Sequence, residues 1–287
     1  MTFLIMQSLV NGVILGFLYL LMSIGFTLVF GIMRVVNFAH GEFYMLGAFA
    51  AFFAVTQLDL PYVVSVALAF GGTILLGALI ERVVFRRFRG DELSGMIASL
   101  GLALILQNLA LIAFGPDPLA MPSLISGAWK LGPLIVPKSR VVVILAAAVI
   151  LVAFYVFLMH TRWGRALRAL VQDSEIAAVY GIRVEVMYPL GLGLGVALAA
   201  IAGALMAPLF GVSPFIGGTP LLKAFIVVIL GGLGSIPGAV LASLLLGVIE
   251  SFTSSFVSAS AADIVTFVLV IAVLLVRPSG LLGHKEA

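Results

Sequence analysis

The sequence contains no cysteine, and its three histidines, His40, His160 and His284, lie far apart. Without cysteine, a disulfide framework, a thiolate metal site and a thiol nucleophile are all excluded. The isolated histidines match no H-E-x-x-H pattern, so we expect no metal site. No G-x-x-x-x-G-K-S/T phosphate loop and no G-x-S-x-G nucleophile elbow occur either. We therefore expect no catalytic residue and no cofactor bound by this chain.

Charged residues are also scarce, at 9% of the 287 residues, whereas 63% are apolar and the mean hydropathy is +1.30. Soluble domains carry about 25% charged residues, so most of this surface is expected to face lipid. A hydrocarbon core of about 30 Å needs about 20 apolar residues per helix, which allows about eight spans, with a range of about seven to nine. No polar stretch is long enough for a soluble domain, so residues 1–287 are expected to form a single transmembrane domain.

Long apolar runs are separated by short connections that are charged or rich in proline and glycine. The runs lack the alternating polarity of a transmembrane β-strand, so the predicted fold is all-α, a polytopic bundle of transmembrane helices. The first run has no basic stretch before it and is too long for a signal peptide, so it is expected to be a retained span. The expected spans are 6–30, 38–57, 61–80, 94–114, 141–160, 188–210, 221–256 and 262–276.

The basic residues predict the orientation. The long connection 115–140 holds only Lys130, Lys138 and Arg140. By the positive-inside rule, this connection and the N-terminus are expected outside, and the more basic connections and the C-terminus in the cytoplasm. The same rule accounts for the net charge of +3, which therefore does not indicate nucleic-acid binding. The residues on the expected cytoplasmic side are Arg34, Arg82, Arg86, Arg87, Arg89, Arg162, Arg165, Arg168, Arg183, Arg277 and Lys285.

The run 221–256 is too long for one span and is interrupted near 231–238 by the sequence GGLGSIPG. Termini on opposite sides require an odd number of crossings, which two helices here, the first of them short, would satisfy. A bent or re-entrant segment is the alternative. A helix broken inside the membrane could aim freed backbone groups at a charged solute, whereas a tight cytoplasmic turn could not. On the first interpretation the solute pathway would include Gly231, Gly232, Gly234, Ser235 and Pro237.

Further polar residues lie in or beside the apolar runs. Asn37 and Glu42 are expected at the cytoplasmic mouth of the second span, where each could contact a solute or stabilise a helix start. Gln107 and Asn108 lie within the fourth span, with Gln107 on about the same helix face as Ser99. They could contact a solute or hydrogen-bond to a neighbouring helix. A stripe of small residues in the sixth span predicts a close helix–helix contact: Gly195, Ala199, Gly203 and Ala207.

The connection 161–187 is expected to form a small amphipathic platform outside the membrane. Asp173 or Ser174 is expected to cap a short helix, and Gly181 to end it. Arginines three residues apart would offer cationic contacts on one helix face. The platform is either a docking surface or a solvated positive-inside loop.

Three stretches resemble the permease subunits of bacterial branched-chain amino acid ABC transporters, specifically the shorter of the two paired permeases. Residues 31–48 read GIMRVVNFAHGEFYMLGA, and residues 223–238 read KAFIVVILGGLGSIPG. The third stretch, 161–187, is similar to the Glu-Ala-Ala-x-x-x-Gly coupling loop of importer permeases, although Ile176 separates the Glu from the Ala pair. The similarity covers nearly the whole chain.

The resemblance implies half of a two-permease pathway for leucine, isoleucine, valine or a related solute, in the bacterial inner (plasma) membrane. The implied partners are a second permease, two cytoplasmic ATPase subunits that bind ATP and Mg, and an extracytoplasmic solute-binding protein. The loop would dock in a groove of an ATPase. The implied coupling residues are Arg162, Arg165, Arg168, Glu175, Ala177, Ala178 and Gly181.

Other functions stay open at this point. Urea and amide importers use permeases of similar sequence, so the solute could belong to that class. A self-sufficient channel or secondary transporter would need an ion- or proton-coupling carboxylate in the middle of a span, and the acidic residues are expected near span ends. A membrane enzyme has no recognisable nucleophile or metal constellation in this sequence.

Overall fold

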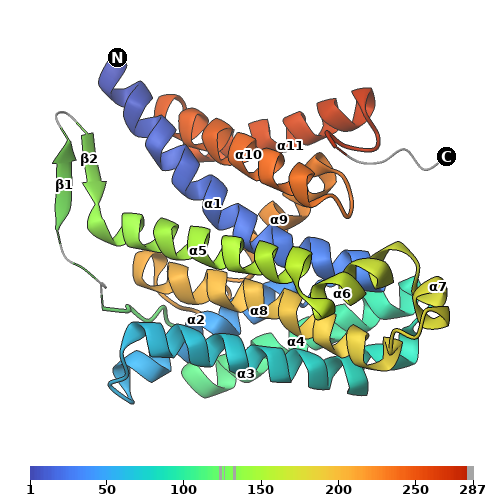
Figure 1. The fold of residues 1–287 in the computed structure, drawn as a ribbon. Helices are drawn as coiled ribbons and strands as arrows, with labels where there is room; N and C mark the ends of the chain where they lie inside the picture. Colours follow the sequence, from blue (N-terminus) through green and yellow to red (C-terminus); the bar gives the residue numbers. More distant parts are fainter. Residues whose placement is uncertain (123–124, 126, 132–133, 283–287) are drawn as a thin grey trace.

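The computed structural model describes residues 1–122, 125, 127–131 and 134–282, and helices make up most of it (Figure 1). The predicted all-α bundle is confirmed. Two apolar helices are shorter than a full span, α2 (His40–Thr56) and α9 (Gly218–Gly231). Among the described residues, seven helices are long and apolar enough to cross a membrane: α1 (Thr2–Met33), α3 (Tyr62–Val83), α4 (Glu92–Phe114), α5 (Lys138–His160), α8 (Val184–Phe210), α10 (Ile236–Phe256) and α11 (Ala259–Val276).

The two ends of the bundle carry different small elements (Figure 1). One end, called the basic end below, holds the 3-10 helix η1 (Phe85–Phe88), α6 (Arg162–Gln172), α7 (Ser174–Val179) and the C-terminal segment 277–282. The opposite end, called the hairpin end, holds the N-terminus and the antiparallel strands β1 (Ala128–Leu131) and β2 (Leu134–Pro137). The termini therefore lie at opposite ends, as the charge distribution predicts.

The β-hairpin was not predicted. It forms inside the proline-rich connection, where Gln7 of α1 supplies a tertiary contact: Gln7 Nε2 donates to the Ile135 carbonyl (3.2 Å) and Gln7 Oε1 accepts from the Ile135 N–H (3.4 Å). The side-chain amide thus satisfies the edge of β2 as a neighbouring strand would. Local sequence contains no sign of a partner so far away in the chain.

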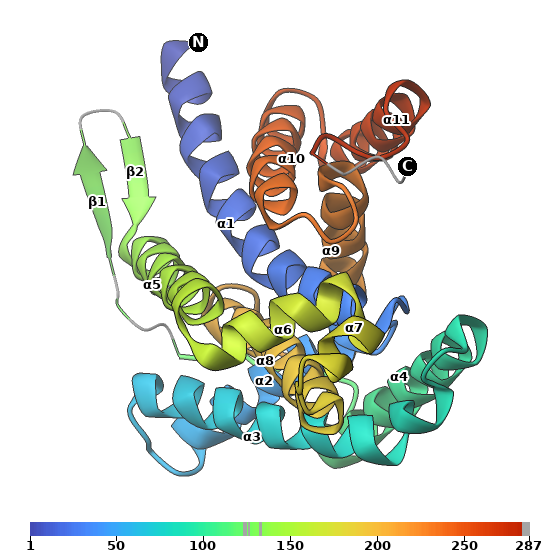
Figure 2. The ribbon, with the colours of Figure 1, turned by 45° about the vertical axis from the view of Figure 1, so that its right-hand side comes forward.

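The N- and C-terminal halves of the bundle repeat one packing pattern in opposite directions. α1 packs along α10 and α3 packs along α8, while α1 and α8 pack on each other at the centre. α2 follows α1 through the short connection 34–39, and α9 follows α8 through 211–217. Figure 2 shows α4 and α11 in corresponding peripheral positions. Residues 2–114 and 184–276 therefore form an inverted-topology repeat, an arrangement that many transporters use.

α2 and α9 begin inside the bundle rather than at its ends. His40 Nε2 lies 3.3 Å from the Met22 carbonyl oxygen, and Met22 is about 16 Å from the end of α1 at 1.5 Å per residue. Gly41 and Gly217 meet backbone to backbone, so α9 starts at the same depth. The expectation that the second span starts at the cytoplasmic mouth is therefore wrong. The connection before it folds back into the bundle, which hydropathy cannot reveal.

The break predicted near 231–238 is present as a tight turn between two helices. α9 ends at Gly231 and α10 starts at Ile236, which gives two helices with the first one short. Gly231 and Gly238 are in backbone contact across this turn. The N–H groups of Leu281 and Leu282 donate to the carbonyls of Leu230 (2.8 Å) and Gly231 (3.0 Å). The turn therefore lies at the basic end, where the C-terminal segment satisfies the last carbonyls of α9.

The small residues of α8 face its two central neighbours. Gly195 lies against Gly25 and Val29 of α1, and a methyl group at Gly203 would overlap the Tyr44 carbonyl oxygen of α2. The other two members of the stripe, Ala199 and Ala207, are buried. Small side chains here let the helix axes approach closely.

Replacing Gly203 by alanine is expected to destabilise the protein by about 1–3 kcal/mol, because the new methyl group forces α2 and α8 apart. The matched control is Gly71→Ala in α3, where nothing lies within 4 Å of the added carbon. Its expected effect is neutral or stabilising by up to about 1 kcal/mol, from helix propensity. Thermal unfolding of both purified variants in detergent measures the difference. Equal melting temperatures for the two would contradict the close contact.

Candidate functional site

α6 lies across the basic end of the bundle. The Gly164 N–H donates to Thr161 Oγ1 (2.9 Å), which caps the helix start, and Leu167 is fully buried against the core. One face of α6 is therefore fixed to the bundle and the other is free. The arginines divide between the two faces: Arg162 and Arg165 are exposed, whereas Arg168 is half-buried and its Nη1 donates to Met159 Sδ (3.1 Å).

α7 projects from the bundle as a short capped helix. As predicted, Asp173 caps it: Oδ1 accepts from the N–H groups of Glu175 and Ile176 (2.9 Å each). Gly181 follows with φ +82°, and Ala177 is the buried residue that holds the helix down. Glu175 and Ala178 are exposed. Three large apolar side chains are exposed beside them, at 56%, 86% and 84%: Ile176, Val179 and Tyr180. Such a group of apolar side chains at a water-facing end is typical of a protein contact surface.

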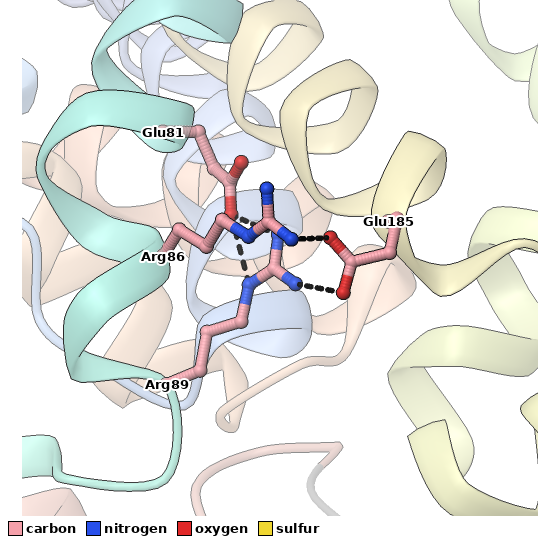
Figure 3. Close-up of polar contacts among 4 residues, drawn as sticks. All are labelled: Glu81, Arg86, Arg89 and Glu185. Carbon is pink, nitrogen blue, oxygen red and sulfur yellow. Dashed lines mark hydrogen bonds and ion pairs between the residues drawn. The ribbon is translucent and has the colours of Figure 1, made fainter.

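Ion pairs connect this platform to the rest of the bundle. Glu185, in the first turn of α8, pairs with Arg86 (3.0 Å) and Arg89 (3.4 Å) (Figure 3). Arg89 Nε also donates to Glu81 Oε1 (2.9 Å), and the Arg89 guanidinium lies 4.1 Å over the Tyr188 ring. The Glu81 side chain is fully buried. A displacement of α7 would therefore reach α3 and η1 through α8.

Asn37 and Glu42 lie together at the start of α2. Asn37 Oδ1 accepts from the Ala39 N–H (3.0 Å) and so shapes the turn into the helix. Among the described residues, Asn37 Nδ2, His40 Nδ1 and Glu42 Oε2 are buried and have no hydrogen-bond partner. Glu42 is in the first turn, where the helix dipole favours its charge. Both sequence interpretations of these residues, helix start and solute contact, are compatible with this geometry.

The polar residues of α4 divide between two environments. Ser99 is buried, and its Oγ accepts from the Phe38 N–H (3.0 Å), which fixes the folded-back connection before α2. Asn108 is exposed on the outer face, where Nδ2 donates to the Leu104 carbonyl (2.7 Å). Gln107 is half-buried. The structure thus brings Ser99, and not Asn108, to the interior of this chain.

The glycine-rich residues 231–237 are far from the start of α2. They form the turn at the basic end, with Ser235 Oγ accepting from the Gly238 N–H (3.1 Å) as the cap of α10. A role of Gly231, Gly232, Gly234, Ser235 and Pro237 in a solute pathway stays a prediction, and the geometry favours the tight turn.

Sequence reasoning missed a charged cluster in the half of the bundle toward the hairpin end. Lys223 of α9 pairs with Glu250 of α10 (3.0 Å) and Asp263 of α11 (2.8 Å). The Lys223 side chain is only 6% exposed. A lysine in an apolar run is costly unless it is paired, so Lys223 followed by apolar residues 224–230 was the signal that could have found it. Its partners are 27 and 40 residues away and could not be named from spacing.

Inverted repeats, helices that begin inside the bundle, a charged cluster around the buried Lys223 and a projecting platform together define a polytopic membrane transport protein. The chain belongs to the family described as branched-chain amino acid transport system / permease component, whose model matches residues 8–274. It is therefore a multi-pass membrane protein of a transport family.

Individual relatives agree with this family. The chain is 37% identical to the high-affinity branched-chain amino acid transport system permease protein LivH of Escherichia coli (strain K12), over 98% of this chain and 96% of LivH. It is also 37% identical to the permease protein BraD of Pseudomonas aeruginosa, with the same coverage. The permease protein LivM of Escherichia coli is 27% identical, over 98% of this chain and 71% of LivM. No solved structure matches this chain.

Replacing Arg89 by methionine is expected to cost about 3–5 kcal/mol of stability, because the buried Glu81 carboxylate loses its counter-ion. The double variant Arg89→Met with Glu81→Gln is expected to recover much of that loss, since no unpaired charge remains buried. Arg86→Met is the control: its pair with Glu185 is exposed and should contribute less than about 1 kcal/mol. Thermal unfolding of the four proteins measures these differences. A loss in Arg86→Met as large as that in Arg89→Met would overturn the assignment.

Proposed function

We propose that this chain is one of two permease subunits of an ATP-driven importer for branched-chain amino acids in the bacterial inner membrane. The observation that carries the proposal is the α6–α7 platform, with its exposed Ile176, Val179 and Tyr180. Family membership supports the class of transporter. The substrate class is taken from the relatives whose printed names specify branched-chain amino acid transport.

The platform fits the role of an ATPase contact. A six-residue helix with exposed apolar side chains and neighbouring exposed arginines can insert into a groove of a partner. Aromatic and arginine side chains commonly dominate such contacts. In this proposal ATP and Mg are bound by two ATPase subunits at the basic end, which is cytoplasmic. This chain performs no chemistry of its own.

Coupling would run from α7 into α8. Closure of the ATPases moves the platform, and the ion pairs of Glu185 transmit that movement to α3 and η1. The inverted repeat then gives two halves that can rock against each other around the interior starts of α2 and α9. The second half of the pathway would come from a second permease, and an extracytoplasmic binding protein would deliver the solute to the hairpin end.

The test is ATP-dependent uptake of radiolabelled leucine into proteoliposomes that contain this chain, the second permease, the ATPases and the binding protein. The variant Val179→Asp with Tyr180→Asp puts two carboxylates into the contact. It is expected to lower uptake at least tenfold and to release the ATPases during purification, since removing interface anchors costs about 2 kcal/mol or more each. Arg168 is left unchanged because it contacts Met159. A substitution there could lower uptake through a loss of stability as well as through a loss of coupling.

Leu58→Asp is the control, because Leu58 is also apolar and exposed, at 55%, but follows α2 at the hairpin end. This variant should keep the ATPases and transport leucine. Leucine uptake by the chain alone, without ATP or partners, would overturn the proposal in favour of a self-sufficient channel or secondary transporter. Competition of uptake by urea or amides, but not by isoleucine or valine, would favour the amide branch.

A further inference from the structure

A cavity of about 420 Å³ opens between α1, α5, α8, α9, α10 and α11 in the half of the bundle toward the hairpin end. This volume lies within the range of about 300–1,000 Å³ that is typical of small-molecule sites. The cavity reaches Thr219 in the first turn of α9, the helix that begins inside the bundle. It therefore connects the hairpin end to the depth at which the two interior helix starts meet.

The charges that line the cavity balance. Two cations, Arg140 and Lys223, and two carboxylates, Glu250 and Asp263, belong to the lining. A lining with equal numbers of both signs suits a zwitterion, because a ligand with a net charge would leave that charge unbalanced in the cavity. A ligand that carries both charges can therefore contact lining groups of either sign.

Two of these groups have capacity to spare. Arg140 Nη1 donates to Asn11 Oδ1 (3.1 Å), and among the described residues Arg140 forms no ion pair with a carboxylate. A guanidinium has five N–H donors and binds carboxylates in a bidentate fashion. Asp263 uses one oxygen for Lys223, and its side chain is 61% exposed. A cationic hydrogen-bond donor, Arg140, and a carboxylate acceptor, Asp263, therefore line the same cavity.

One wall of the cavity is apolar. Leu15, Leu18 and Ile14 of α1 face the cavity, together with Leu209 and Phe210 at the end of α8. A hydrocarbon side chain that leaves water for this wall gains about 25 cal/mol per Å² of buried apolar surface. A ligand with a charged head of both signs and an aliphatic tail therefore matches the charged groups and the apolar wall of the cavity.

We propose that this cavity binds the transported amino acid, with the α-carboxylate on Arg140, the α-ammonium on Asp263 and the aliphatic side chain against α1 and α8. This inference rests on the proposed function and assigns the site within it. Lys223 lies between Glu250 and Asp263 and holds them in position, because the two carboxylates would otherwise repel each other. Thr219, in the first turn of α9, lines the inner end of the site, where the N-terminus of the helix carries a partial positive charge.

The absence of native cysteine makes a protection experiment direct. Ser254→Cys places one thiol in the exposed part of the cavity lining, and Gln57→Cys places one on the exposed connection at the same end of the bundle. Each variant, in the assembled transporter in membranes, is labelled with a membrane-impermeant thiol reagent in the presence of increasing L-leucine. At ten times the dissociation constant, labelling of Ser254→Cys should slow about tenfold, and labelling of Gln57→Cys should not change.

Ligand analogues and substitutions of Arg140 test the charge contacts. 4-Methylpentanoate lacks the ammonium group and 3-methylbutylamine lacks the carboxylate, so each should protect at least about tenfold less well than leucine. Adding Arg140→Gln to Ser254→Cys should raise the half-protecting leucine concentration by at least about tenfold. Arg140→Lys, which keeps the charge, should recover part of the protection.

Unchanged labelling of Ser254→Cys at saturating leucine, in a transporter that takes up leucine with ATP, would overturn this site and leave the proposed function intact. Equal protection by all three ligands would overturn the charge assignment. If leucine is not taken up with ATP by the unmodified transporter, the proposed function fails, and the site assignment fails with it.

Discussion

Two helix starts inside a lipid-facing bundle are the constraint on which the rest of this structure depends. Freed backbone groups are tolerated at that depth only where protein surrounds them. The small residues of α8 contribute to this protection, because Gly195 and Gly203 let α8 pack directly against α1 and α2. Gly41 and Gly217 then bring the start of α9 to the same place. A larger side chain at these crossings would separate the helices and expose the backbone.

The same constraint explains where the charges lie. The ion pairs of Glu185 lie at the basic end, where water also stabilises them, and four further charged side chains line the cavity that starts at α9. Lys223 is nearly buried and has two carboxylate partners on two further helices. The cluster joins α9, α10 and α11 and also gives the cavity its balanced charge. In the proposed site, packing and solute recognition therefore depend on the same residues.

The inverted repeat by itself makes the two ends of the bundle similar, and the segment between its halves makes them different. Each half contributes one interior helix start, and the starts meet at the centre of the bundle. The middle segment, with α5, α6 and α7, belongs to neither half and supplies the platform at the basic end. An event at α7 can act on both halves because α8 begins directly after the platform and packs on α1, α2 and α3.

The sequence by itself determined the class of fold, the number of spans within narrow limits, the position of the platform and the cap at Asp173. Hydropathy, the distribution of arginine and local capping rules depend only on neighbouring residues or on the surrounding solvent. Tertiary structure alone decided that α2 and α9 begin inside the bundle, that Gly231–Gly238 turns at its end, and that Lys223 meets Glu250 and Asp263. These features depend on contacts between helices far apart in the chain, which no local pattern specifies.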